Sequence, residues 1–359
     1  MKLLNKIILI AAVALLSVPT YAQEEEAPEP TFGISGSVDT YFRSTEYAPY
    51  TSFANLNGFA LGMANVIMSY EGEKSGFVAD FVFGPRGNDA VFGSEVGSTP
   101  IVNQLYVYYN LSDSFTLTLG NFNTFLGYEV ISPAANFNYS TSYMFSYGPF
   151  SHSGIKADIG LSDDVSLMLG VFNETDSTEY QAVDGTPEEE FVFGAQLGLF
   201  GQYINFISGG AANQTQIDFT GGIDLGDSFF LGVNATSYSS DGGDFSGVAL
   251  YPQYTFSDSF ALGLRFESFT DDSYGALGTY VNGEAIGIGS GSSKLDNTSI
   301  TLTGSFSAGN FMFKPEFRVD TASEAILYDG ADTDSISSFV IAAISVSYTH
   351  LTLPTNREV

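Results

Sequence analysis

A short acidic turn recurs along the chain between runs of alternating apolar residues. The segment LSDSFTLTLG begins at Leu111, and close variants of it begin at Leu161, Leu225 and Phe256. Ser-Asp-Ser and Gly-Asp-Ser sequences favour tight turns because their side chains bond the nearby backbone. The flanking residues alternate with the period of a β-strand. Each repeat therefore predicts a hairpin of two antiparallel strands.

Short turns and longer polar segments follow each other in a regular order. The seven short turns lie near Gly72, Ser112, Ser162, Phe200, Gly226, Ser257 and Ser307. The longer segments are 44–57, 85–100, 125–151, 174–190, 271–296 and 322–334, with two smaller ones near Gly209 and Gly242. Such asymmetry is typical of outer-membrane barrels, which have short periplasmic turns and long extracellular loops. The order predicts about 16 strands over residues 32–349, with 14 to 18 as the range.

The faces of the expected strands differ in polarity. In the first strand, Phe32 and Val38 fall on one face, and Asp39, Tyr41 and Arg43 fall on the other. The chain is 44% hydrophobic, yet no long apolar run follows the first 22 residues. Since only helices and closed barrels satisfy their backbone in lipid, the sequence predicts an all-β fold, a transmembrane antiparallel up-and-down β-barrel.

The N-terminal residues predict export. Lys2 and Lys6 precede an apolar run of ten residues, Ile7 to Leu16, and a cleavage site is expected at Ala22, so residues 1–22 are interpreted as a signal peptide. The alternative, an N-terminal anchor, requires a run of about 20 residues. Residues 23–31 are expected to form an acidic, disordered leader. The expected location is the bacterial outer membrane, in contact with its lipid.

The last ten residues do not continue the strand pattern. We expect the final strand to end at Thr349, whereas barrels of this class typically end on an aromatic residue. The sequence THLTLPTNREV resembles a translated sequencing adaptor, and residues 350–359 are interpreted as a non-native tail. A native periplasmic tail is the alternative.

Charged residues on the polar faces predict the lining of a pore. A barrel of about 16 strands leaves an aqueous channel, through which small hydrophilic solutes or ions would diffuse passively. The residues expected to line the pore are Asp39, Arg43, Asp80, Lys156, Asp158, Asp218, Arg265, Glu267, Lys314, Glu316, Arg318 and Asp320. Acidic residues outnumber basic ones in this set, which predicts a weak cation preference.

The segment 125–151 is rich in aromatic and amide residues and carries one charge, Glu129. A long aromatic loop is poorly suited to open water, so we expect it to fold into the barrel and narrow the pore. The constriction would present Glu129, Asn136, Asn138, Tyr139 and Tyr143. Opposite them, Arg43, Arg265, Lys314 and Arg318 would create a transverse field. In the alternatives, the segment is a plain extracellular loop, or it braces the rim while Glu129 pairs with Lys156 or His152.

Other functions find little support in the sequence. Ser151 and His152 are adjacent on an expected strand and point to opposite faces, which excludes a nucleophile and base pair. The chain has no cysteine and only 11 basic residues against 41 acidic ones, so we expect no enzyme activity, no metal or cofactor and no nucleic-acid partner. A structural or adhesive surface barrel is the alternative function, and a homo-oligomer is compatible with either.

Three short motifs around the aromatic segment resemble those of the OmpL-like β-barrel porins. They are Gly127-Tyr128-Glu129, Asn138-Tyr139-Ser140 and His152-Ser153-Gly154. The resemblance implies a porin-like barrel in the outer membrane. It implies neither a particular solute nor any catalytic residue.

Overall fold

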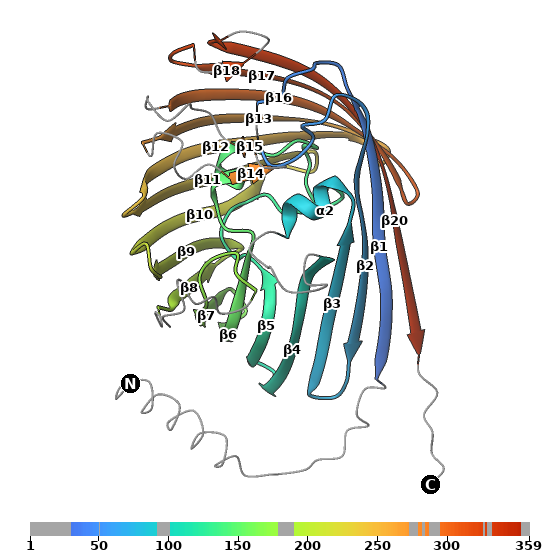
Figure 1. The fold of residues 1–359 in the computed structure, drawn as a ribbon. Coiled ribbons are helices and arrows are strands. Elements are labelled where there is room, and N and C mark those ends of the chain that lie inside the picture. Colours follow the sequence, from blue (N-terminus) through green and yellow to red (C-terminus); the bar gives the residue numbers. More distant parts are fainter. Residues whose placement is uncertain are drawn as a thin grey trace.

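A computed structural model describes residues 30–49, 51–91, 101–178, 190–272, 279–281, 284–286, 295–325, 327–328 and 332–352. Within these residues the chain forms one closed antiparallel barrel of sixteen strands, each paired with the next barrel strand in the sequence (Figure 1). The predicted fold class and strand number are thus confirmed. Among the described residues, no helix is long and apolar enough to cross a membrane.

The first half of the barrel consists of β1 (Thr31–Arg43), β2 (Gly58–Glu71), β3 (Ser75–Phe83), β4 (Val102–Ser112), β5 (Phe115–Asn123), β6 (Ser151–Ser162), β7 (Val165–Phe172) and β8 (Val192–Leu199). The second half consists of β9 (Gln202–Gly209), β10 (Gln214–Asp224), β11 (Phe229–Ser240), β12 (Gly243–Ser257), β13 (Phe260–Asp271), β16 (Leu295–Ala308), β17 (Phe311–Ala322) and β20 (Ser335–Thr352). All seven predicted short turns fall between consecutive strands, and the predicted loop 44–57 has the bounds observed between β1 and β2.

Among the described residues, two short helices and two small hairpins lie in the long loops. The helices are α2 (Pro85–Ala90) after β3 and α3 (Tyr143–Tyr147) before β6. One hairpin is formed by β14 (Thr279–Val281) and β15 (Glu284–Ile286), the other by β18 (Leu327–Tyr328) and β19 (Asp332–Thr333). These elements were not predicted because each spans only two to six residues, which is too few for a helix or strand period to be recognised.

The outer face of the barrel is apolar, as the alternation predicts. In β1, Val38 is 59% exposed while its neighbour Asp39 is 2% exposed. Near the short turns, rings of neighbouring strands contact one another, with Phe260 and Phe306 stacked at 4.6 Å between centroids. Exposed apolar side chains with an aromatic girdle at one end are typical of a lipid-facing barrel surface.

The first and last strands close the barrel. Their register runs from Thr31 opposite Thr352 to Arg43 opposite Val340. The expected last strand ended at Thr349, but the backbone ladder continues for three more residues. The remainder of the proposed tail, 353–359, lies outside the described residues. So do the predicted signal peptide and nearly all of the leader.

Long loops enter the barrel. The segment between β5 and β6, with α3, crosses the interior, and α2 also lies inside the barrel wall (Figure 1). One buried cluster joins loop and wall through Tyr143, Met144, Phe245 and Phe269. Another joins Phe53, Phe145 and Phe150 from two loops to Val82 of the wall. The lumen is therefore filled at several points by side chains rather than left open across its width.

Candidate channel constriction

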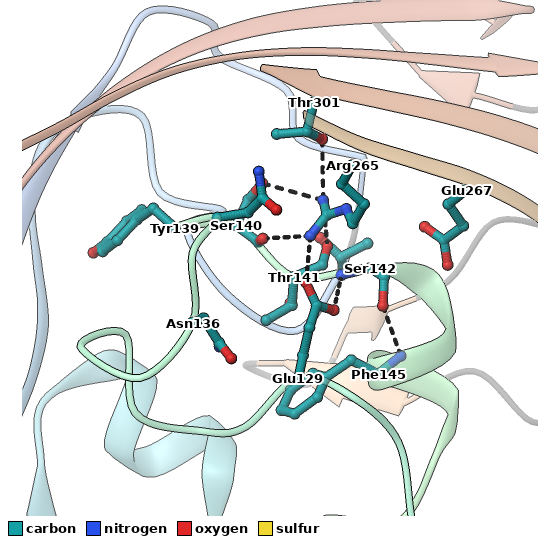
Figure 2. Close-up of polar contacts among 12 residues, drawn as sticks. Glu129, Asn136, Tyr139, Ser140, Thr141, Ser142, Phe145, Arg265, Glu267 and Thr301 are labelled. Atoms are coloured by element: carbon teal, nitrogen blue, oxygen red, sulfur yellow. Dashed lines mark hydrogen bonds and ion pairs between the residues drawn. The ribbon is translucent and has the colours of Figure 1, made fainter. Parts of the chain in front are cut away.

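The loop between β5 and β6, residues 124–150, is here called the inner loop. Its backbone carbonyls bind cations of the wall. Arg265 of β13 donates from Nη1 to the carbonyl of Ser140 at 2.6 Å and from Nη2 to that of Thr141 at 3.2 Å (Figure 2). Arg318 of β17 donates from Nη1 to the same Thr141 carbonyl at 2.7 Å. Lys314 donates to the carbonyl of Pro133 at 3.1 Å.

Backbone N–H groups of the inner loop bind carboxylates of the wall. Glu316 of β17 accepts from Tyr139 N at 2.7 Å and from Ser140 N at 3.0 Å. Glu267 of β13 accepts from the first two amides of α3, Tyr143 at 3.0 Å and Met144 at 2.9 Å. These amides have no partner within the helix, and charged acceptors form strong bonds to them.

Further contacts fix the start and the middle of the inner loop. The amide of Gly127 donates to Asp218 of β10 at 2.9 Å, and the hydroxyl of Tyr139 donates to Asp39 of β1. Asn138 donates from Nδ2 to Thr303 of β16 at 2.7 Å. The loop is thus bonded to β1, β10, β13, β16 and β17, and its path across the interior is set by wall side chains.

Glu129, the single charged residue of the inner loop, belongs to the same network of hydrogen bonds between loop and wall. Glu129 forms an ion pair of 2.6 Å with Arg265 and accepts from Ser142 N at 2.7 Å (Figure 2). Neither Lys156 nor His152 is its partner, contrary to one expectation. His152 instead contacts Thr124 through Nε2 at 3.0 Å, with its ring 5.0 Å from that of Phe172.

The predicted pore-lining residues all lie on inward positions, but most are covered. The residues at most 3% exposed are Asp39, Arg43, Asp80, Asp218, Arg265, Glu267, Lys314, Glu316, Arg318 and Asp320. Lys156 and Asp158 remain accessible and pair with each other at 2.8 Å, with side chains 24% and 42% exposed. The expectation that water solvates the wall charges therefore does not hold for the covered set, because loop backbone and neighbouring side chains replace the water. Whether any of them borders the conducting path stays a prediction.

The predicted constriction residues are likewise buried. Asn136 bonds the backbone of Val130 through both amide atoms, at 2.9 Å and at 2.6 Å. Tyr139 and Tyr143 are 1% and 0% exposed. Asn138 is engaged by the wall as described above. These polar groups bond the loop to itself and to the wall. That they also face a passing solute within a transverse field stays a prediction.

Two further arginines, one at the end of β1 and one in α2, bind loop segments. Arg43 binds loop 44–57 through the carbonyls of Tyr47 and Asn55. Arg86 of α2 donates to the carbonyl of Tyr139 at 3.2 Å and lies 4.3 Å from the centroid of the Phe53 ring. Arg86 was not predicted as a site residue because it lies in a polar loop with no strand pattern.

Burial raises the pKa values of several ionisable groups in the loops. Burial, as the larger cause, and the nearby charge of Glu129, as the smaller one, raise the pKa of Tyr128 to about 12. Burial also raises the pKa of Tyr139 and of Tyr143 well above the ordinary value. These hydroxyls therefore remain protonated at neutral pH. In the loop after β7, burial raises the pKa of Asp176 to about 6, against the opposing effect of two backbone amides.

A cavity of about 560 Å³ lies between the inner loop and the wall. Its wall residues come from the ends of β11, β12, β16 and β17 that adjoin short turns, so it lies toward the short-turn end of the barrel. The loop side includes Tyr128 and Phe137, and the wall side includes Phe230, Gln253 and Ser305. Its volume is within the range of pockets that hold small molecules.

A family model described as "Putative beta-barrel porin-2, OmpL-like" matches residues 31–348. The match covers the whole barrel up to the last residues of β20. No curated protein matches the chain.

Solved outer-membrane barrels share the fold. A loop-deletion mutant of OmpT from Vibrio cholerae matches with a TM-score of 0.55 at 13% identity, covering 89% of this chain and 100% of that chain. In-vitro folded OmpT of the same organism, in a trimer form, matches with a TM-score of 0.54 at 15% identity, with the same coverage. At this identity the likeness shows the barrel architecture alone.

Proposed function

We propose that this chain, which belongs to the family described as putative β-barrel porin-2, OmpL-like, forms a narrow channel for passive diffusion of small hydrophilic solutes and ions across the outer membrane. The observation that carries the proposal is the course of the inner loop. It enters the barrel and is bonded to opposite parts of the wall, β10 and β1, where it would set the width of any path through the lumen.

The expected channel has a low conductance. Inward side chains at the level of the inner loop are buried, which leaves little cross-section for water. Accessible polar groups occur on β6, where Lys156 and Asp158 reach the solvent. The inward acidic residues still outnumber the basic ones, which supports a weak cation preference.

The test is a planar-bilayer recording of the purified, folded protein. Replacement of 136–143 by a short Gly-Ser linker removes bonds to Glu316, Glu267 and Arg318 and should increase the single-channel conductance several-fold. The variant Asp241→Ser, in the exposed loop between β11 and β12, should leave conductance unchanged. Unchanged conductance in a stably folded linker variant would contradict the role of the inner loop.

Selectivity is tested by the reversal potential in a salt gradient. A cation preference that decreases in Asp158→Asn, but not in Asp227→Asn of an exposed short turn, supports the proposed path along β6. A clear anion preference would contradict it.

A structural barrel without transport is the second candidate. The burial of nearly all inward charges beside the inner loop favours it, because a fully plugged barrel has the same property. The absence of conductance in well-folded protein would support this candidate and refute the channel. Assembly into oligomers is proposed for either case, and chemical cross-linking in the membrane tests it.

A further inference from the structure

We infer that the cavity between the inner loop and the wall is a binding site for a neutral saccharide. The inference rests on the proposed function, since it names the class of solute that this channel would take. It goes beyond that function because a specific site, rather than simple diffusion, determines which solute is held.

The aromatic side chains of the cavity come from both of its sides. Tyr128 and Phe137 belong to the inner loop, and Phe230 belongs to β11. All three side chains are partly exposed. Flat apolar rings with nearby hydrogen-bonding groups suit the faces of a sugar ring, whose C–H groups pack on the aromatic face while its hydroxyls point outward.

Two loop rings are held rigidly by the wall. Gly232 and Gly263 leave the space that these rings occupy: a Cβ at Gly232 would lie 2.4 Å from the Tyr128 hydroxyl, and one at Gly263 would lie 2.3 Å from the Phe137 ring. Tyr128 also stacks on Tyr251 with 4.2 Å between ring centroids. The ring surface is thus fixed before a ligand arrives, which lowers the entropic cost of binding.

The charges around the cavity favour a neutral ligand. Glu129 is paired with Arg265, and the ammonium of Lys314 donates to two loop carbonyls, so both groups already have partners within the protein. A charged ligand would have to compete with these bonds. The amide of Gln253 and the hydroxyl of Ser305 lie on the wall side, where they can bond sugar hydroxyls.

The position of the cavity predicts that a saccharide blocks the ion current more strongly from the short-turn side of the barrel than from the long-loop side. Its wall residues lie near the short turns, whereas the inner loop separates it from the long-loop end. Maltotriose added at the short-turn side should therefore reduce the ion current in a saturable manner. Gluconate, which is charged, should have a weaker effect at equal concentration.

A fluorescence measurement tests binding without requiring conduction. The chain contains no tryptophan, so Phe230→Trp introduces a single reporter in the cavity. Tyr254→Trp introduces one on the outward face of β12, where Tyr254 is 45% exposed. Maltotriose should change the emission of the Phe230→Trp protein with saturation and leave that of the Tyr254→Trp protein unchanged.

Point variants test the assigned residues. Phe230→Ala and Gln253→Ala should each weaken the block by maltotriose about tenfold, while Tyr254→Ala should have no effect. A folded, conducting protein that shows neither saturable block nor a fluorescence change would overturn the saccharide site and leave the channel proposal standing. Absent conductance together with a saturable fluorescence change would refute the channel but not the site.

Discussion

Arg265 of the wall and Glu129 of the inner loop form an ion pair of 2.6 Å, although 136 residues separate them in the chain. Their side chains are 0% and 3% exposed. A pair so thoroughly removed from water is costly to break, because the remaining partner keeps its charge in a low-dielectric interior.

Arg265→Met should lower the free energy of unfolding by about 3–5 kcal/mol, since it leaves the Glu129 carboxylate buried without its cation. The double variant Arg265→Met, Glu129→Gln should recover part of this loss. Urea unfolding in phospholipid vesicles measures both. Lys156→Met is the control, because its ion pair with Asp158 is solvent-accessible and is expected to contribute about 0–1 kcal/mol. Equal losses in Arg265→Met and Lys156→Met would contradict the buried role.

Glu267→Gln should loosen α3. The carboxylate accepts two amide hydrogens, whereas a glutamine offers one acceptor oxygen and an amide group that opposes the second donor. Amide hydrogen exchange at Tyr143 and Met144 should become about tenfold faster.

Asp218→Asn is the matched control for that variant. It alters the carboxylate that accepts the hydrogen bond from Gly127 N, near the start of the inner loop. Faster exchange should then occur near Gly127 and not in α3. If either variant accelerates exchange throughout the loop, the wall contacts do not act independently.

Asp176 should make stability pH-dependent. Its pKa in the folded protein is raised from 3.8 to about 6, so the folded state binds its proton more tightly than the unfolded state. The resulting stabilisation is fully present below about pH 4 and is lost as pH rises through about 6, with a total of at most about 3 kcal/mol. The difference in unfolding free energy between wild type and Asp176→Asn, measured from pH 4 to 7, should follow this course. A difference that does not vary with pH would contradict it.

Deletion of residues 350–359 should leave folding intact. The deletion removes three ladder residues of β20 but keeps the register from Ile34 opposite Thr349 onward. Heat-modifiable migration on gels should persist. Deletion from Ser345 also removes the pairs with Val38 and with Phe311, and it should abolish that migration. If the deletion of residues 350–359 already abolishes heat-modifiable migration, the last ten residues are part of the fold.

The strands and turns were predictable because their signals are local. The bounds of loop 44–57 and the turn near Gly226 follow from neighbouring residues, and the inward position of Asp39 follows from alternation alone. The partners of the inward charges were not predictable in this way. Glu316 binds the amide of Tyr139 across 177 residues, and no sequence pattern indicates that a peptide group rather than water meets that carboxylate.

The contacts of Tyr139 also constrain the order of assembly. Its side chain bonds Asp39 of the first strand, and its backbone bonds Glu316 of the penultimate barrel strand. These bonds cannot all form until both ends of the chain have reached the wall, and contacts between residues so distant in sequence form slowly. We therefore expect the inner loop to reach its final position late in folding, after most of the barrel wall has formed.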